Sequence, residues 1–256
     1  MLLGDAATSF AAVADIVVMV LYVRWIKKRL GSDFVIGFRF DNLGKGLAMC
    51  AVVCVPMIID NLLESAKIVG ATPMNLSAAE FVRAFVDQVF YGLRPGITEE
   101  CLCRVMLMGI IMHLTKGKKH RLGMAVGLSS CIFGVLHLIN ILNGAPVAIT
   151  LYQVLYASAI GVMFAAVYAR TRNIIATMIF HSLVDITSKC YVNFYPELVA
   201  VGEELAQTPS RGDAVVYLTV TVLCVAFGLY LLRPSKHHEI EEHWGSLAAA
   251  EEVSAV

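Results

Sequence analysis

Residues 123–142 read GMAVGLSSCIFGVLHLINIL and contain no lysine, arginine, aspartate or glutamate. A helix of about 20 mainly apolar residues is long enough to cross the hydrocarbon core of a bilayer. This stretch is therefore predicted to be a transmembrane helix. Similar apolar stretches on both sides of it predict further crossings, at residues 7–23, 43–63, 97–114, 148–168, 174–192 and 214–232.

An eighth stretch, residues 76–93, is less apolar because it carries Glu80, Arg83 and Asp87. Such a segment can span the membrane, re-enter it or lie in the interface. The sequence therefore predicts an all-α fold, a polytopic transmembrane bundle of seven or eight helices surrounded by the lipid bilayer.

The composition agrees with that fold. The chain of 256 residues is 58% hydrophobic and only 16% charged, whereas a soluble domain is about 25% charged. The 20 basic residues equal the 20 acidic residues, so no net charge indicates a nucleic-acid partner. We expect one integral-membrane domain over residues 1–256, with the catalytic motifs in 95–190 and a flexible acidic tail over 233–256.

The basic residues suggest an orientation, because cytoplasmic loops carry an excess of lysine and arginine. The loop 115–122 is basic, which predicts that it is cytoplasmic and that Glu99 and Glu100 lie toward the outer side of the helix 97–114. Four basic sites can share one side if residues 76–93 do not fully cross; they contain Arg24 to Lys45, Lys116 to Arg121, Arg170 with Arg172, and Arg233 with Lys236. The compact chain shows no organelle-targeting segment, so a bacterial plasma membrane is the expected location.

Charged residues within the apolar stretches are the main functional signal. The segment ITEECLCRVMLMGII holds adjacent Glu99 and Glu100, and then Arg104. A charge at membrane depth costs roughly 2.5–3.5 kcal/mol, so it needs a partner, water or a function. Glu100 and Arg104 are one helical turn apart and can pair, whereas Glu99 is rotated by about 100°. A helix start after the Pro-Gly pair at 95 and 96 would explain the glutamates, but not the arginine.

Two later helices each bring a histidine into an apolar run. Phe133 and His137 share one helix face, and His181 and Asp185 share another. Each histidine alone is more often a core residue, but three helices with ionisable groups predict a polar pocket. A carboxylate beside a histidine can act as a general base on water, and the second histidine could stabilise an oxyanion or complete a ligand set. This set of carboxylates and histidines fits hydrolysis of an acyl or peptide bond, or a proton relay.

In this order the motifs resemble a known family. EECLCR at 99–104, FGVLH at 133–137 and HSLVD at 181–185 are similar to EExxxR, FxxxH and HxxxN or HxxxD of the CAAX-protease and bacteriocin-processing family, also called the CPBP or Abi intramembrane proteases. The resemblance implies that Glu99 activates a water that His137 helps to hold. It also implies that Arg104 orients Glu100.

The third motif has a further implication. By resemblance, His181 and Asp185 form the oxyanion-stabilising side, where many members have asparagine instead of aspartate. An ionised aspartate would repel an oxyanion, so Asp185 must be protonated, bind a metal or orient His181. The family is described both as glutamate-type and as metal-dependent, so a Zn²⁺ bound by Glu99, His137 and His181 stays open as the cofactor.

The function predicted from these residues is an intramembrane endopeptidase for a prenylated, otherwise lipidated or signal-like peptide or protein at the membrane. The oligomeric state is left open. One alternative is a non-catalytic immunity or scaffold protein with the same fold. Another is a proton-coupled transporter that also uses Asp15, Asp60 and Asp87, although Asp15 is expected to be a helix-packing partner.

Other intramembrane protease classes fit less well. The sequence has no HExxH, which excludes the site-2 zinc class, and no GxGD, which argues against the aspartyl class. GLSS with Ser129, together with His181, faintly resembles the serine class but lacks its second glycine. Small residues that let helices pack closely are the preferred explanation of that stretch.

Overall fold

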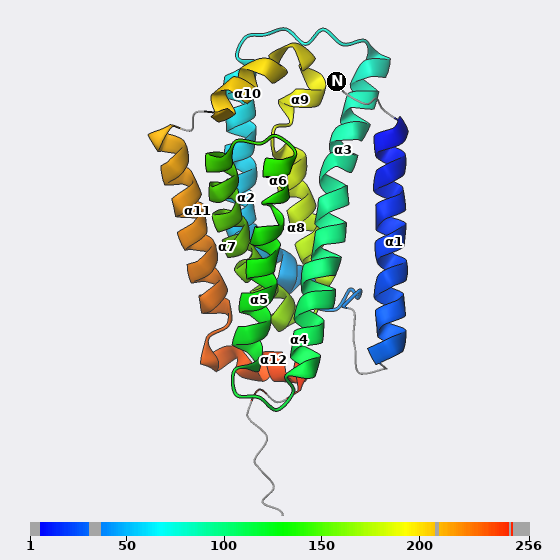
Figure 1. The fold of residues 1–256 in the computed structure, drawn as a ribbon, viewed down its shortest axis with the longest axis vertical. Coiled ribbons are helices and arrows are strands. Elements are labelled where there is room, and N and C mark those ends of the chain that lie inside the picture. Colours follow the sequence, from blue (N-terminus) through cyan, green and yellow to red (C-terminus); the bar gives the residue numbers. More distant parts are fainter. Residues whose placement is uncertain (1–5, 31–36, 208–209, 246, 248–256) are drawn as a thin grey trace, which may run out of the picture.

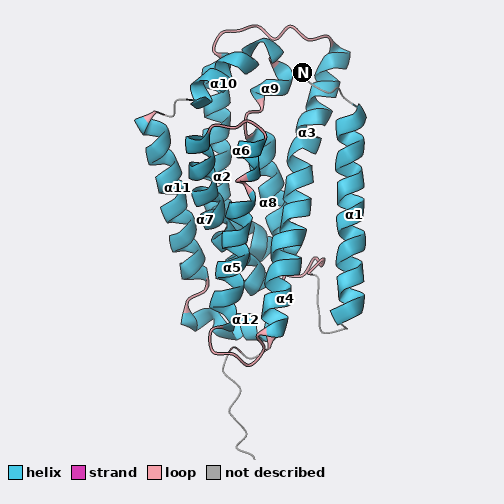
Figure 2. Cartoon of the chain, in the orientation of Figure 1, coloured by secondary structure: helices cyan, strands magenta, loops and turns pink. Residues whose placement is uncertain are grey.

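The computed structural model describes residues 6–30, 37–207, 210–245 and 247. Helices and loops make up this part of the chain, and no β-strand occurs in it (Figure 2). The all-α fold predicted from the sequence is therefore confirmed. The longer helices are α1 (Ala6–Leu30), α2 (Leu43–Val69), α3 (Ala78–Glu100), α5 (Arg121–Leu136), α7 (Val147–Thr171), α8 (Ile174–Thr187) and α11 (Arg211–Leu231). The shorter elements are the π-helix η1 (Cys101–Met108), α4 (Gly109–Leu114), α6 (Ile139–Leu142), α9 (Tyr191–Phe194), the 3₁₀ turn η2 (Pro196–Leu198), α10 (Val199–Gln207), the 3₁₀ turn η3 (Pro234–Lys236) and α12 (His237–Trp244).

The longer helices run side by side as a bundle, with α1 at its edge beside α3 (Figure 1). In the described part of the chain, four helices are long and apolar enough to cross a membrane, namely Leu43–Val69, Arg121–Leu142, Val147–Thr171 and Arg211–Leu231. Their outer faces expose large apolar side chains, among them Val52, Ile59, Val222 and Leu223. Apolar outward faces on a helical bundle suit a lipid surround.

The stretches 76–93 and 97–114 belong to one continuous helical rod. The elements α3, η1 and α4 follow each other without a break from Ala78 to Leu114, and the rod passes through Pro95. The expected helix 97–114 is therefore part of a longer rod, and Glu99 and Glu100 lie well inside this rod rather than near its start. The side of the membrane toward which they lie stays a prediction. The rod begins at Ser77, whose hydroxyl accepts the Glu80 N–H in a capping box.

The rod and α8 approach each other so closely that their backbones touch. Gly92 and Gly96 lie one turn apart on α3. A Cβ added at Gly92 would lie 2.5 Å from the backbone nitrogen of Ile186, and one at Gly96 would lie 2.7 Å from that of Ser182. Small residues four apart permit this kind of helix packing in membranes. The contact brings the glutamate pair of α3 opposite the histidine of α8.

The four basic sites lie together at one end of the bundle. Asn173, at the α7–α8 joint, donates to the carbonyls of Arg39 and Asp41 before α2, and Arg121 at the start of α5 donates to Gly245. The end of α1 and the α11–α12 connection lie at this same end (Figure 1). A single basic end, as the sequence allowed, is the arrangement that the positive-inside rule requires.

The first part of the expected flexible tail is a folded helix. In α12, Ile240 is completely buried, and the Trp244 indole donates to the Ala169 carbonyl at 2.9 Å. The Arg172 guanidinium stacks on the Trp244 ring at 4.9 Å. These contacts hold α12 across the basic end, so the predicted flexibility is wrong for residues 237–244. Residues 246 and 248–256 of the predicted tail lie outside the described residues.

Candidate active site

The predicted pair of Glu100 and Arg104 forms at the centre of the bundle. Both side chains are fully buried, and Arg104 Nη2 lies 3.3 Å from Glu100 Oε1. The same carboxylate oxygen lies 3.1 Å from Nδ1 of His181 on α8. Because a carboxylate oxygen accepts, His181 carries its Nδ1 proton and donates it to Glu100. Glu100 thus joins the first and third sequence motifs.

The other ring nitrogen of His181 faces two more carboxylates. Its Nε2 lies 3.7 Å from Glu99 Oε2 and 3.5 Å from Asp185 Oδ2. Glu99, Glu100 and Asp185 therefore surround one imidazole, with Arg104 as the buried counter-charge. The one-turn spacing of His181 and Asp185 predicted that these two side chains share a face, and the contact confirms it.

The two adjacent glutamates differ in access. The Glu100 side chain is 0% exposed, whereas the Glu99 side chain is 34% exposed and that of Asp185 is 28% exposed. Glu99 and Asp185 are therefore accessible from outside, while Glu100 is enclosed. This division separates two accessible carboxylates from one that fixes the histidine.

Phe133 connects these groups through its ring. The Arg104 guanidinium lies 4.7 Å from the Phe133 ring centroid, a distance typical of a cation–π interaction. The same ring makes edge contacts with His181 at 5.7 Å and with His137 at 5.2 Å. Phe133, the first residue of FGVLH, thus contacts residues of all three motifs.

His137 approaches the site less directly. Its Nδ1 lies 2.9 Å from the Phe133 carbonyl oxygen, so this nitrogen donates and, in the neutral ring, Nε2 is left as an acceptor. Among the described residues, the polar contact of His137 is to this carbonyl, and no carboxylate of the site contacts its ring. Any interaction of His137 with Glu99 therefore needs a bridging molecule.

The zinc ligand set suggested by the resemblance does not converge. In the described part of the chain, no three His, Cys, Asp or Glu side chains gather as ligands for a metal ion. His181 uses Nδ1 on Glu100, and His137 uses Nδ1 on its own helix. Both bonds leave Nε2 of each ring open, as in metal-ligating histidines, so a zinc ion held by Glu99, His137 and His181 stays a prediction.

The residues that would serve a serine protease or a proton-coupled transporter lie outside this site. Ser129 is completely buried and its hydroxyl donates to the Val126 carbonyl of its own helix, which is the packing role preferred from the sequence. Asp15 on α1 accepts from Arg94 Nε of α3 at 2.6 Å, which confirms it as a helix-packing partner.

Several polar residues near the site were missed from the sequence. Asn61 of α2 donates to the Val184 carbonyl and the Thr187 hydroxyl, while Gln88 of α3 accepts from Asn193. These bonds fasten α8 to α2 and α9 to α3 around and beyond Asp185. Uncharged polar residues in apolar helices were the available signal, because buried amides need hydrogen-bond partners.

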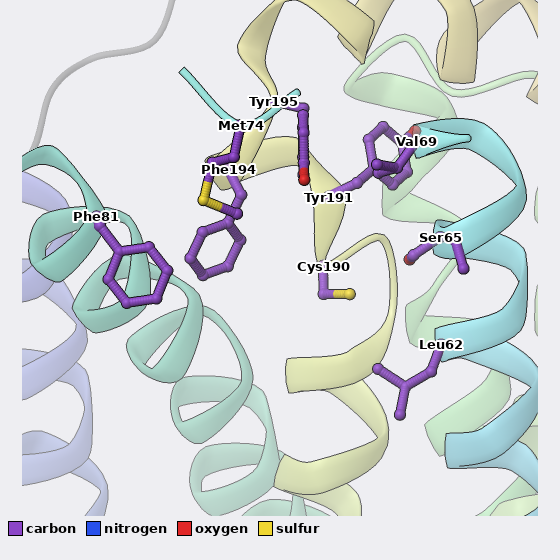
Figure 3. A pocket seen from close by; sticks show the side chains of 10 residues that line it. Leu62, Ser65, Val69, Met74, Phe81, Cys190, Tyr191, Phe194 and Tyr195 are labelled. Atoms are coloured by element: carbon purple, nitrogen blue, oxygen red, sulfur yellow. The ribbon is translucent and has the colours of Figure 1, made fainter. Parts of the chain in front are cut away.

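An open apolar pocket of about 360 Å³ lies where α8 continues into α9 (Figure 3). No charged residue lines it, and Cys190 in its wall lies five residues beyond Asp185 on the same segment. Its lining comes from α2, the loop before α3, α3 and the α9 region, and consists of Leu62, Ser65, Ala66, Val69, Met74, Phe81, Cys190, Tyr191, Phe194 and Tyr195. Such a lining suits an apolar chain rather than a charged group.

The part of the chain that forms this site is similar to a known protein family. Residues 81–187 match the family model described as Type II CAAX prenyl endopeptidase Rce1-like. That range contains all three motifs and the contacts between α3 and α8. No curated protein and no solved structure matches the chain. Residues 81–187, which hold all three motifs, are therefore similar to the CAAX prenyl endopeptidases that this family model describes.

Proposed function

We propose that the protein hydrolyses a peptide bond of a prenylated, membrane-associated peptide or protein by means of a glutamate-activated water. The observation that carries this proposal is the group of three carboxylates around His181, backed by a buried arginine, in an otherwise apolar bundle. Ionisable groups at this depth are costly and are kept for function. The family match supports the reaction class.

Glu99 is the general base in this proposal, because its carboxylate is the accessible one of the glutamate pair. It takes a proton from water while the water oxygen bonds to the scissile carbonyl carbon. The C–N bond then breaks, and Glu99 returns the proton to the leaving nitrogen. A base positioned in this way contributes about 10²–10⁴-fold to the rate.

His181 acts on the other side of the reacting carbonyl. Its Nδ1 proton is held by Glu100, so the ring orientation is fixed and Nε2 is directed at the open part of the site. A protonated Nε2 would donate to the developing oxyanion. Asp185, at 3.5 Å from Nε2, is proposed to orient His181 and balance its charge rather than to bind the oxyanion itself.

His137 is proposed to position the attacking water. Its Nε2 is the acceptor left by the Phe133 bond, and its ring contacts the same Phe133 that contacts His181. A water between His137 and Glu99 would bridge the second motif to the first. The apolar pocket beside Cys190 is proposed to take the hydrocarbon part of the substrate.

The test is cleavage of a farnesylated peptide by the purified protein in proteoliposomes. Glu99→Gln should lower kcat at least about 100-fold without changing the unfolding temperature. The matched control is Glu64→Gln, which makes the same change on α2, where Glu64 pairs with the exposed Lys67. Equal cleavage by the Glu99 and Glu64 variants would overturn the proposal and favour a non-catalytic scaffold.

A second experiment, with a zinc chelator, tests whether cleavage depends on a metal ion. Since the donor groups do not converge on a metal in this arrangement, we expect cleavage to persist after incubation with a zinc chelator and gel filtration. Loss of cleavage on chelation, with recovery on adding Zn²⁺, would replace the glutamate-only mechanism by a metal-dependent one.

A further inference from the structure

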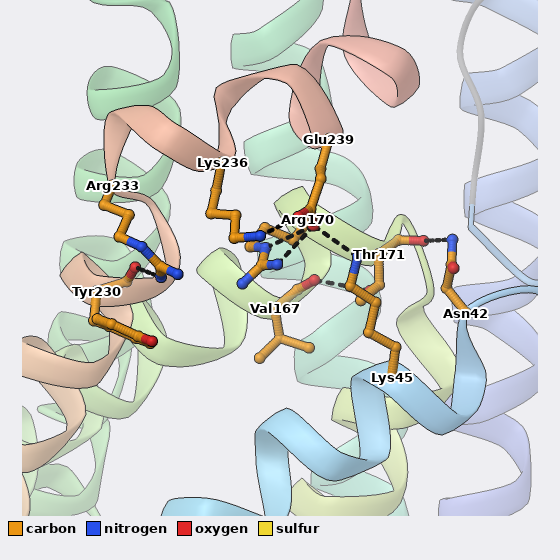
Figure 4. Close-up of polar contacts among 9 residues, drawn as sticks. All are labelled: Asn42, Lys45, Val167, Arg170, Thr171, Tyr230, Arg233, Lys236 and Glu239. Atoms are coloured by element: carbon orange, nitrogen blue, oxygen red, sulfur yellow. Dashed lines mark hydrogen bonds and ion pairs between the residues drawn. The ribbon is translucent and has the colours of Figure 1, made fainter.

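The basic end of the bundle contains a charge cluster that the proposed reaction does not use. Glu239 of α12 accepts from Lys45 at 2.6 Å, from Arg170 Nη2 at 2.6 Å and from Lys236 at 2.8 Å. Figure 4 shows the three cations converging on this one carboxylate from α2, α7 and η3. We call Lys45, Arg170 and Lys236 the α12 basic cluster.

The α12 basic cluster has more positive charge than Glu239 can balance. The Arg170 side chain is only 6% exposed, so its charge is poorly solvated and depends on nearby anions. Lys45 and Lys236 are 40% and 28% exposed, so their ammonium groups can be reached from outside. The cluster therefore combines a buried guanidinium with two accessible ammonium groups, a donor set that suits a phosphate group.

The surroundings place this cluster at the level of lipid headgroups. Arg233 lies 3.9 Å from the Tyr230 ring and donates to the Tyr230 carbonyl at the end of the apolar helix α11. Trp244 packs at the same end, on the last turn of α7. Tyrosine, tryptophan and arginine at helix ends mark the membrane–water interface. The anions concentrated at that level are the headgroups of acidic phospholipids.

We propose that the α12 basic cluster binds the phosphate group of an anionic phospholipid. Lys45 and Lys236 make the outer contacts and Arg170 supplies charge from below, while Glu239 is a built-in anion that competes with the lipid for the same donors. Lipid binding then stabilises the junction of α2, α7 and α12. This function is separate from peptide hydrolysis and does not depend on it.

The test compares unfolding temperatures in nanodiscs of phosphatidylcholine alone and of phosphatidylcholine with phosphatidylglycerol. The anionic lipid should raise the unfolding temperature of the unmodified protein, because a ligand of the folded state stabilises it. Lys236→Gln should weaken lipid binding about fivefold, as expected for one basic contact near the surface, so the rise in unfolding temperature should be smaller. The control Lys118→Gln removes an equal charge from the exposed loop before α5 and should leave the effect intact.

A second variant should change the effect of the anionic lipid in the opposite direction. Glu239→Gln removes the competing anion, so it should lower the unfolding temperature in neutral lipid yet increase the rise produced by phosphatidylglycerol. Inorganic phosphate added to neutral nanodiscs distinguishes a free anion from a lipid and should have no such effect.

Three results would overturn the proposal. One is an equal lipid effect in the Lys236 and Lys118 variants, and another is a weaker lipid effect in Glu239→Gln. The third is a stabilisation by inorganic phosphate as large as that by phosphatidylglycerol, which would assign the site to a soluble anion instead.

Discussion

The candidate active site and the α12 basic cluster are built with opposite charge. In the candidate active site, three carboxylates surround His181, and one fully buried arginine pairs with Glu100. In the α12 basic cluster, three cations surround the single carboxylate of Glu239. The first lies within the bundle, and the second lies at its end.

The difference shows how position decides what an excess of charge can do. Inside the bundle an unbalanced carboxylate is poorly solvated, so each must be held by a partner or be used in chemistry. At the end of the bundle, cations are compatible with headgroups and water. Substitutions that remove one charge should therefore have large effects in the first region and small effects in the second.

The largest effect is expected from removing the buried arginine. Arg104→Met would leave Glu100 fully buried without its counter-charge, which should cost roughly 3–5 kcal/mol of unfolding free energy. Urea unfolding in detergent measures this. The matched control is Arg94→Met, whose pair with Asp15 is about half exposed and should cost at most about 1 kcal/mol. Equal losses of unfolding free energy in the two variants would mean that burial does not determine how much these ion pairs contribute to stability.

A smaller effect is expected where the helices of the active site touch. In Gly96→Ala, the added Cβ would lie 2.7 Å from the Ser182 backbone nitrogen, so α3 and α8 must move apart. We expect a loss of about 1–3 kcal/mol and a fall in kcat at nearly unchanged KM, since Glu99 and His181 separate. Gly123→Ala, where a Cβ meets nothing within 4 Å, should leave cleavage unchanged. Unimpaired cleavage by Gly96→Ala would contradict the role of this contact.

The α12 basic cluster should respond to pH. Partial burial raises the pKa of Glu239, but the hydrogen bonds from Lys236, Lys45 and Arg170 outweigh it and hold this pKa well below its ordinary value of 4.5. A lowered folded-state pKa stabilises the protein above about pH 4.5, and this stabilisation is lost as the pH falls further. The difference in unfolding free energy between the unmodified protein and Glu239→Gln should be about 1 kcal/mol at pH 7 and should shrink below pH 4.5. A constant difference across that range would show that the Glu239 charge contributes nothing.

The uncharged pocket should show the smallest effect. Cys190→Phe would occupy part of the pocket and displace about one methylene group of a bound hydrocarbon chain, worth about 0.8 kcal/mol. The KM for the farnesylated peptide should then rise about fourfold, with kcat unchanged. Cys131→Phe, at an exposed position of α5, is the control. An equal KM for both variants would remove the pocket from the substrate path.

Local spacing predicted the pairs within each helix of the site. The four-residue intervals from Glu100 to Arg104 and from His181 to Asp185 place their side chains on one face whatever the rest of the fold does. The sequence did not predict which glutamate is enclosed, because that depends on the approach of α8. The four-residue spacing of Gly92 and Gly96 is the feature of the sequence that indicates this approach.

Two parts of the fold were wrongly predicted for a common reason. The stretch after Arg233 is polar, so it resembled a solvated tail, yet Ile240 and Trp244 lie one turn apart and find partners on distant helices. Pro95 suggested a helix boundary, yet its missing N–H is tolerated in a rod packed by neighbours. In both cases contacts far along the chain outweighed the local composition.

The π-helical turns of Cys101–Met108 make the rod sensitive to its own length. A π-helix bonds each N–H to a carbonyl five residues back, so it holds more residues per turn than the α-helical parts on either side. Deleting one residue between Glu100 and Arg104 would let this segment return to α geometry and shorten their spacing from four residues to three. Such a single-codon deletion would change the angle at which Arg104 faces Glu100 while leaving every side chain of the motifs in the protein.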